Sequence, residues 1–313
     1  MQRLQQEKGM ALLLVLGVIA LLTSLLSEFA FSTLVDLRLT ETFRDRTGAY
    51  YLARGGIEAG RIILQVDTNG YDHPDELWGQ GVPNYPAGEG TVSIEIEDLS
   101  GRFNLNSVAD NRGNPLPGYH RFVALCEEVL ALSASEADSL AAALRDWKNA
   151  DSQFVSTDES YYLQQQPPYS RKAGALDAVE ELNLIKGFDA EMVEKLTPFV
   201  RVFGDNKLNI NTASAELLFA WQSSAAAGNF QPILDRPDVD AIVEYRDQQP
   251  FESLDDLNQV NGWDSSWISA WQDATVKGTI YQIRGEGQVN LGIRVAEAIV
   301  LKTENRLLSL RVE

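Results

Sequence analysis

The stretch EKGMALLLVLGVIALLTSLLSEFAF at residues 7–31 decides the fold, because a charged leader gives way there to a long apolar run. No charged residue lies between Lys8 and Glu28. At a rise of about 1.5 Å per residue, residues 10–27 would extend for about 27 Å as a helix, close to the thickness of the bilayer hydrocarbon. The sequence therefore predicts one membrane span at residues 10–27.

A cleavable secretory signal is the alternative to a retained span, because it also places a charged leader before an apolar region. The sequence after Ser27 favours retention, since apolar residues continue at helical spacing without a proline. We expect one helix over residues 10–66, embedded in the membrane at first and amphipathic afterwards.

Composition limits what the rest of the chain can do. The 313 residues carry 45 acidic and 26 basic side chains, a net charge of −19, and such a surface is soluble and repels nucleic acid. The single cysteine, Cys126, lies on an apolar helical stripe, so we expect a small core residue and no disulfide within the chain. The two histidines have no partners at catalytic or ligand spacing, so we do not expect an enzyme.

Two stretches of alternating apolar and polar residues predict the strands. Residues 91–107 alternate and then turn at Ser100-Gly101, which predicts a hairpin, and residues 278–313 alternate in the same way. Three prolines and five glycines in residues 68–90 predict a loop. We expect an α+β fold, with one small antiparallel sheet packed on the long helix. Its α/β domain comprises residues 67–107 and 278–313, and a helical domain is inserted at residues 108–277.

The predicted insert contains a weak repeat and two helical hairpins. GRFNLNSV at residues 101–108 and NKLNINTASAELL at residues 206–218 share an N-x-N step. Residues 178–200 and 238–263 resemble helix-hairpin-helix units, which in other proteins hold DNA phosphate at the hairpin glycine. A membrane-tethered DNA-binding receptor is therefore the alternative function.

Charge argues against that alternative. Asp189, Glu191 and Asp264 stand beside the two hairpin turns, so a phosphate would meet net negative charge. We expect no nucleic acid partner, and we interpret the hairpins as packing modules.

An acidic segment after the residue pair Asp146-Trp147 is the candidate metal site. Carboxylate, amide and hydroxyl oxygens crowd into it, and calcium accepts six to eight oxygens at relaxed geometry. The segment lacks the EF-hand spacing, and a solvated acidic loop is the alternative. The predicted ligands are Asp146, Asn149, Asp151, Thr157, Asp158 and Glu159.

The junction KGMALLL resembles the type IV prepilin leader, in which a peptidase cuts between a glycine and an apolar helix that is retained. By that resemblance, residues 1–9 are a leader cut by prepilin peptidase between Gly9 and Met10, and Met10 becomes an N-methylated terminus. Most pilin-like chains carry a glutamate at the fifth position after the cut, where this chain has Leu14. The minor pseudopilin K family of type II secretion is similar in lacking that glutamate.

The same family resemblance extends along nearly the whole chain, through DLSGRFNLN, DWKNAD, TDESYY, PPY and KLNINTASAELL in that order. It implies a noncatalytic subunit at the tip of a pseudopilus, working in protein export with the minor pseudopilins I and J. It implies a single pass through the bacterial inner membrane, with the C-terminal bulk in the periplasm. Family members bind calcium at the acidic segment, which implies one or two ions here. Asn149 replaces a family aspartate and Thr157 replaces an alanine.

Overall fold

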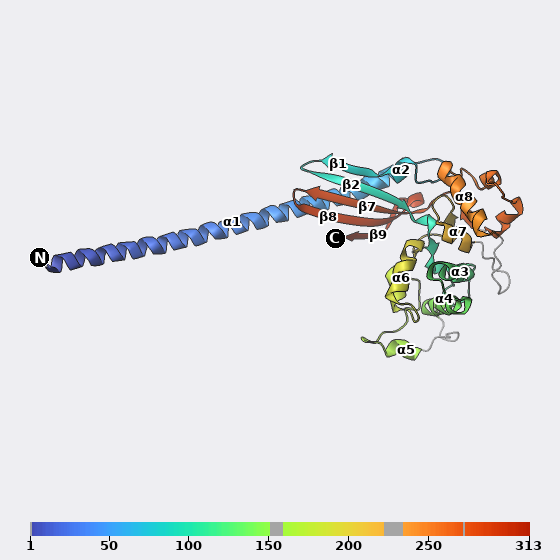
Figure 1. Ribbon diagram of the computed structural model, residues 1–313, viewed down its shortest axis with the longest axis horizontal. Helices are drawn as coiled ribbons and strands as arrows, with labels where there is room; N and C mark the ends of the chain where they lie inside the picture. Colours follow the sequence, from blue (N-terminus) through green and yellow to red (C-terminus); the bar gives the residue numbers. More distant parts are fainter. Residues whose placement is uncertain (1, 151–158, 222–233, 272) are drawn as a thin grey trace.

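The computed structural model describes residues 2–150, 159–221, 234–271 and 273–313. A single long helix, α1 at Gln2–Val66, projects from a folded body made of a sheet and a group of short helices (Figure 1). The sheet packs on the C-terminal half of α1, and the helical body lies beyond the end of the sheet (Figure 1). An α+β fold of this arrangement was predicted from the sequence and is confirmed.

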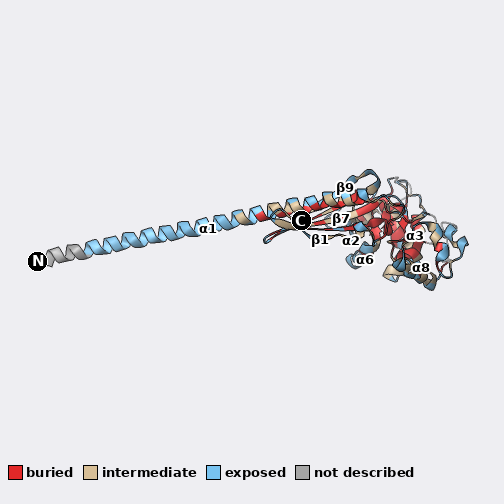
Figure 2. Cartoon of the chain, turned by 90° about the horizontal axis from the view of Figure 1, so that it is seen from above, coloured by how far each residue is buried: buried red, intermediate tan, exposed pale blue. Residues whose placement is uncertain are grey.

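Helix α1 changes character along its length. Its side chains are exposed from Met10 to Thr40, and buried positions begin at Asp45 and Ala49 (Figure 2). The predicted end near Val66 is confirmed, whereas the helix begins at Gln2 rather than at Met10, because helical backbone continues into the charged leader. The exposed part is the apolar run that the sequence assigns to a membrane.

Five strands form an antiparallel sheet in the described part of the chain, in the order β1-β2-β7-β8-β9. Helix α1 covers β2, β7 and β8, and contact is close because glycines line the helix face. A Cβ atom added at Gly60 would lie 2.6 Å from Cγ2 of Ile283. The strands are β1 at Val82–Ala87, β2 at Gly90–Asp98, β7 at Ile280–Val289, β8 at Gly292–Leu301 and β9 at Arg306–Val312.

The loop predicted at residues 68–90 is wrong in part. Helix α2 at Leu77–Gln80 and strand β1 lie within it, and β1 pairs with β2 along one edge of the sheet. Strand β1 tolerates Pro83 and Pro86 because an edge strand needs only half of its backbone groups for pairing. Proline content therefore concealed a strand at the sheet edge.

The predicted hairpin at Ser100-Gly101 is also wrong. Oδ1 of Asp98 accepts a hydrogen bond from the Ser100 amide at 2.8 Å, and a 3₁₀ turn, η1 at Leu99–Gly101, ends the strand. The next strand, β3 at Phe103–Asn104, pairs in parallel with β4 at Val200–Arg201. The chain thus leaves the sheet and enters the helical body.

The helical body has one large core, in which Cys126 is fully buried as predicted. The two predicted hairpins turn at Gly187 and Gly262, with φ of +95° and +85°. Of the four arms beside these glycines, only Ala190–Leu196 is an α-helix. The other three, Val179–Leu184, Leu254–Gln259 and Ser265–Ala270, are 3₁₀ turns. The helices are α3 at Gly118–Leu130, α4 at Ala134–Lys148, α5 at Glu159–Leu163, α6 at Ala190–Leu196, α7 at Ala215–Trp221 and α8 at Arg236–Gln248. The remaining short elements are η2 at Leu105–Ser107, η4 at Val179–Leu184, η5 at Thr197–Phe199, β5 at Leu208–Asn209, η6 at Leu254–Gln259, η7 at Ser265–Ala270, β6 at Ala274–Thr275 and η8 at Lys302–Glu304.

Candidate functional site

The apolar half of α1 is the first functional feature. By length and composition α1 can cross a membrane from Met10 onward, and no residue of its most apolar window is buried. Leu14 is 68% exposed on this segment, with no charged group at its position. The described side chains of α1 begin at Met10, so the cleavage between Gly9 and Met10 and the methylation of Met10 stay predictions.

The acidic segment is described at its two ends. Asp146 is fully buried in the last turn of α4, Asn149 is the residue that ends that helix, and Glu159 begins α5. Asp151, Thr157 and Asp158 lie outside the described residues. The structure therefore places three of the six predicted ligands.

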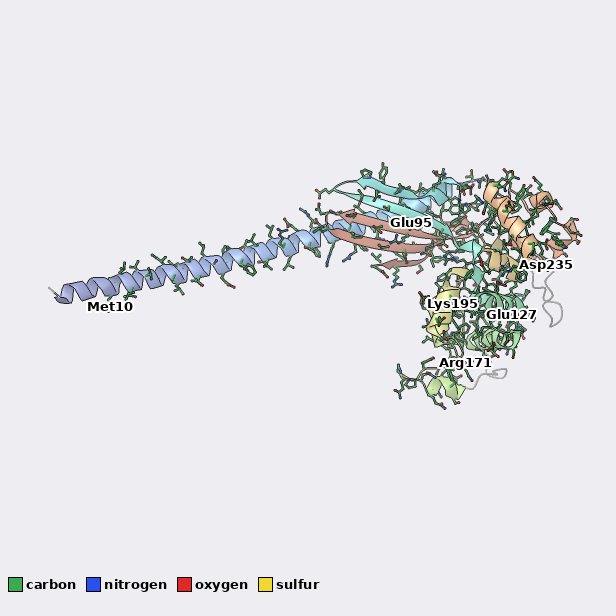
Figure 3. All side chains as sticks on the ribbon, in the orientation of Figure 1. Met10, Glu95, Glu127, Arg171, Lys195 and Asp235 are labelled. Atoms are coloured by element: carbon green, nitrogen blue, oxygen red, sulfur yellow. The ribbon has the colours of Figure 1, made fainter. Side chains whose placement is uncertain are left out.

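These three residues converge on one cation, the guanidinium of Arg171. Its Nη1 donates to the backbone carbonyl oxygens of Asp146 at 2.5 Å and Asn149 at 3.2 Å, and its Nε donates to Oε2 of Glu159 at 2.7 Å. Figure 3 places Arg171 beside α5, on the side of the helical body away from the sheet. The sequence analysis missed this residue, although it follows the acidic segment in PPYSRKAG.

The oxygens around Arg171 are of the kind that calcium prefers, namely carbonyl and carboxylate oxygens. Oδ1 of Asp146 accepts from Nε and Nη2 of Arg145, each at 3.3 Å, so Arg145 is a cationic partner of the carboxylate and Arg171 bonds the backbone carbonyl. These oxygens fit calcium, and the guanidinium of Arg171 already contacts the backbone carbonyls of Asp146 and Asn149 and the carboxylate of Glu159. An ion bound there would compete with Arg171.

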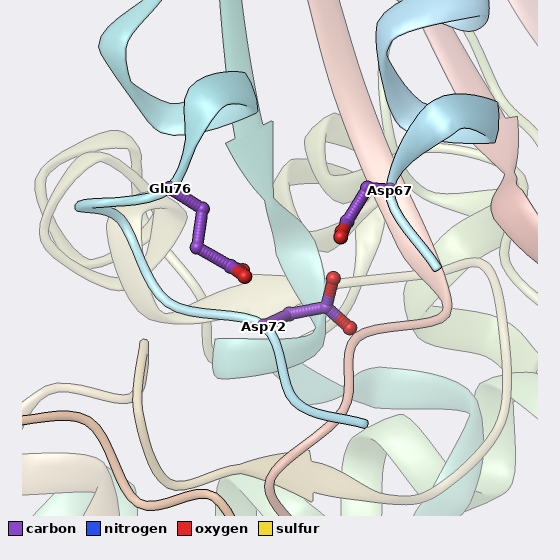
Figure 4. A group of neighbouring side chains, drawn as sticks. All are labelled: Asp67, Asp72 and Glu76. Carbon is purple, nitrogen blue, oxygen red and sulfur yellow. The ribbon is translucent and has the colours of Figure 1, made fainter. Parts of the chain in front are cut away.

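A second acidic group lies where α1 ends. Carboxylate oxygens of Asp67, Asp72 and Glu76 all lie within 4.8 Å of one another and point into one space (Figure 4). Nζ of Lys302, from the turn after β8, lies 2.7 Å from Oδ2 of Asp67 and also contacts Oδ1 of Asp72. Oε2 of Glu76 accepts from the His73 amide at 2.9 Å.

Electrostatics make this group a structural junction. Burial raises the pKa of the fully buried Asp72 carboxyl, although Lys302 opposes that change. Burial lowers the pKa of Lys302, but hydrogen bonds to Asp67 and Asp72 outweigh it and leave this pKa raised. Lys302 therefore supplies the positive charge for Asp67 and Asp72, and it connects the end of α1 to the sheet.

Asp98 extends the junction into the helical body. Its Oδ2 accepts from Nδ2 of Asn209 and from Oγ1 of Thr212, each at 2.8 Å, and the same Nδ2 donates to the carbonyl of Asp72 at 3.0 Å. Asp98 is only 4% exposed, and burial raises its pKa. His73 is buried beside this junction, where its amide donates to Glu76 and its Nδ1 accepts from the Asp75 amide in the turn before α2.

Comparison with known proteins identifies the family. Residues 101–205 and residues 208–276 match two models described as type II secretion system protein K, together more than half of the chain. The chain belongs to the type II secretion system protein K family. Membership of this family gives it a minor pseudopilin role in type II secretion, and the match begins and ends where the helical body does.

Relatives agree with the assignment. The chain is 28% identical to the protein K of Klebsiella pneumoniae over 214 residues, covering 66% of this chain and 66% of that protein. It is 27% identical to the protein K of Pseudomonas aeruginosa over 266 residues, covering 81% and 76%. Its fold resembles a chain in the crystal structure of the GspK-GspI-GspJ complex from the type 2 secretion system of enterotoxigenic Escherichia coli. That comparison has a TM-score of 0.69 at 18% identity and covers 89% of this chain and 99% of the other.

Proposed function

We propose that the chain is the minor pseudopilin at the tip of the type II secretion pseudopilus, with a structural role in protein export across the outer membrane. Residues 10–27 hold it in the bacterial inner membrane, and the bulk after this span lies in the periplasm. The observation that carries the proposal is α1, whose exposed apolar half continues as one helix into the half that packs on the sheet. Such a helix is both a membrane anchor and a rigid stalk.

Prepilin peptidase would cut between Gly9 and Met10 and leave Met10 as an N-methylated terminus. Leu14 supports the tip position by a charge argument. A glutamate buried in lipid at that position would need a neighbour's terminal ammonium as its partner, and a leucine needs none. A subunit with Leu14 can therefore lead a filament, where no subunit lies ahead.

The minor pseudopilins I and J are the proposed partners, as in the complex formed by the protein with the similar fold. Apolar residues of α1 stay exposed beyond the proposed span, and helices of neighbouring subunits would cover them. These residues are Phe29, Phe31, Leu34, Leu37, Leu39 and Phe43.

Purification of the full chain from its own bacterium tests these proposals. The intact mass should match a chain that begins at Met10 with one added methyl group, and pseudopilins I and J should co-purify in detergent. A chain of full precursor mass, or one recovered alone from cells that secrete normally, would overturn the pseudopilin proposal.

The DNA-receptor alternative gains no support from the hairpins. The carboxylates of Asp189 and Asp264 accept hydrogen bonds from the amides of Met192 and Ser266, each at 2.8 Å. At the start of a helical arm, such amides have no partner within the arm and could bind a phosphate. Here the two carboxylates already occupy them. Retardation of duplex DNA by the chain at physiological salt would revive this alternative.

We also propose that the acidic segment binds calcium, as one or two ions. Asp146, Asn149 and Glu159 would hold an ion together with Asp151, Thr157 and Asp158, and a bound ion would relieve the repulsion among their carboxylates. The positions of the Asp146 and Asn149 backbone carbonyls and the Glu159 carboxylate support the proposal, because these oxygens already contact one cation, Arg171. No catalytic chemistry is proposed for the ion.

A further inference from the structure

Strand β9 is an outer strand of the sheet, and within the described residues no further strand pairs with its outer edge. The backbones of Val295 and Glu313 exchange two hydrogen bonds, at 3.3 and 2.9 Å. Because hydrogen-bonded and non-bonded pairs alternate along antiparallel strands, the amide and carbonyl groups of Leu310 and Val312 point away from β8. Free backbone groups of this kind can pair with a strand from another chain.

The opposite edge of the sheet is protected against such pairing. Strand β1 contains Pro83 and Pro86, and its register shifts between Val82 and Tyr85. Prolines and irregular register are devices by which edge strands avoid pairing with other chains. The pairing of β9 with β8 also shifts register, between Ile299 and Val300, but β9, with the sequence RLLSLRV, contains no proline. The two edges therefore differ in their prolines.

Strand β9 also overhangs α1 and leaves apolar side chains uncovered. Leu310 lies opposite Ala298 on the face of the sheet that packs against α1, and Ala298 is 1% exposed whereas Leu310 is 39% exposed. Leu307 on the same strand is also 39% exposed. An added strand would extend the sheet and cover these leucines.

Charge on this side of the molecule indicates which partner fits. Arg61 on α1 donates to Asn305 in the turn before β9, and Arg54 lies two helical turns earlier on the same side. Five arginines lie around the edge with four glutamates, in a chain of net charge −19. Three of these arginines form ion pairs there, Arg61 with Glu58, Arg306 with Glu304 and Arg311 with Glu313. The other members of this group are Arg54, Arg294 and Glu297.

This excess of basic side chains disfavours a second copy of the chain. Pairing of two β9 edges about a twofold axis would place the same basic border against itself. A partner with acidic side chains around an apolar strand would instead be attracted.

We propose that the free edge of β9 is the docking edge for a pseudopilin partner, which adds an extended segment with alternating apolar residues and acidic flanks. This inference rests on the proposed function, because it takes the partner to be pseudopilin I or J. The C-terminus of β9 points toward the membrane end of α1 (Figure 1), so the edge runs beside the stalk. A neighbour anchored in the same membrane could therefore reach it.

Hydrogen exchange on the wild-type full chain tests the edge without any substitution. The amides of Leu310 and Val312 should exchange at least about tenfold more slowly when pseudopilins I and J of the same bacterium are bound. Unchanged exchange at both amides in a complex that does form would overturn docking at β9. Failure of the wild-type chain to bind either pseudopilin would instead contradict the proposed function.

Substitutions then separate the two edges. Leu310→Lys and Leu310→Pro should each lower recovery of the partner about tenfold, since one places a charge on the edge and the other removes an outward amide. Tyr85→Lys, on the exposed edge strand β1, is the matched control and should leave recovery unchanged. The melting temperature of each variant confirms folding. Full recovery with both Leu310 variants, or an equal loss with Tyr85→Lys, would overturn the proposal.

Discussion

Asn106 and Asn211 make the same contact in two different parts of the helical body. Nδ2 of Asn106 donates to the Leu176 carbonyl at 2.9 Å, and the Leu176 amide donates back to its Oδ1 at 2.9 Å. Asn211 pairs with Phe251 in the same way, at 2.9 and 3.0 Å. Each asparagine side chain therefore donates to and accepts from the backbone of one residue, as a neighbouring β-strand would.

This likeness extends to the surrounding structure. The preceding asparagine of each N-x-N step, Asn104 or Asn209, accepts a hydrogen bond from the amide two residues later. Each unit also closes with a short parallel pair, β3 with β4 and β5 with β6. The two matched family models divide the chain between β4 and β5, so the helical body consists of two related units.

Replacement of Asn211 by alanine should destabilise the chain strongly. The change leaves the buried amide and carbonyl of Phe251 without partners, and each unpaired buried group costs about 1–3 kcal/mol. Thermal unfolding of the purified full chain in detergent measures the effect. Asn258→Ala, at an exposed position, should change the unfolding free energy by no more than about 0.5 kcal/mol. Equal melting temperatures for the two variants would contradict the role of Asn211.

The weak N-x-N repeat was visible in the sequence, but the partners of its asparagines were not. Leu176 and Phe251 lie far along the chain in segments with no common pattern, so only the folded chain shows that they are equivalent. The long helix and the strands at residues 278–313 were predictable because their apolar periods are strong.

The junction and the acidic segment show why the rest could not be predicted. Lys302 meets Asp67 and Asp72 across more than two hundred residues, and no local signal links such positions. Arg171 follows the acidic residues in sequence, yet its contact with Glu159 depends on the turn between them. Long-range ion pairs of this kind arise from tertiary structure alone.

Replacement of Lys302 by methionine should weaken the junction. Asp72, which is fully buried, would lose its cation, and removal of one partner from a buried ion pair costs about 3–5 kcal/mol. Adding Asp72→Asn to that variant should restore part of the loss, because the uncompensated buried charge is then gone. Thermal unfolding of the single and double variants measures the coupling.

The matched control for Lys302 is Lys195→Met on α6. Lys195 pairs with Glu191 at 2.7 Å, but both side chains are more than half exposed. Exposed pairs contribute at most about 1 kcal/mol. Additive effects of Lys302→Met and Asp72→Asn would show that the two side chains do not depend on each other.

Asp98 should give the chain a distinctive pH dependence. Burial raises the pKa of this carboxyl above 3.8, so the folded chain binds more protons than the unfolded chain between 3.8 and the raised value. The contribution of Asp98 to the free energy of unfolding therefore falls as pH rises through that window. Asp98→Asn should remove this slope. It should also lower stability at neutral pH, because the amide nitrogen cannot accept the bonds from Asn209 and Thr212.

Unfolding measured in both proteins from about pH 3.5 to about pH 7 checks this prediction, because this range begins below the ordinary carboxyl pKa and ends at neutral pH. The free energy of unfolding of the wild type, relative to that of Asp98→Asn, should be greatest at low pH and should fall as pH rises. Parallel curves would show that Asp98 does not change its protonation on folding.

Leu14→Glu should impair membrane integration or assembly if this subunit leads the filament. A carboxylate there has no terminal ammonium to pair with, and a charge near mid-bilayer costs about 2.5–3.5 kcal/mol on insertion scales. Thr40→Glu, at an exposed polar position of α1 beyond the proposed span, is the control and should integrate and assemble normally. Membrane fractionation and a secretion assay give the result. Normal assembly of the Leu14 variant would indicate that another subunit lies ahead of it.

Calcium should stabilise the full chain, because an ion that binds only the folded form contributes about 2.7 kcal/mol at a hundredfold excess over its Kd. Chelator should lower the melting temperature, and magnesium should restore little of the loss because it requires a tighter octahedral shell. Asp151→Ala should behave like chelation.

Arg171→Gln should strengthen calcium binding, since the guanidinium contacts the oxygens of Asp146, Asn149 and Glu159 that the ion would use. Lys172→Gln is the matched control, because the neighbouring Lys172 pairs with Asp177 and Glu181 instead. Calorimetric titration with calcium measures each Kd. If wild type melts at one temperature in calcium and in chelator, the acidic segment binds no ion; if it does bind and Arg171→Gln weakens the affinity, the arginine supports the site rather than competing for it.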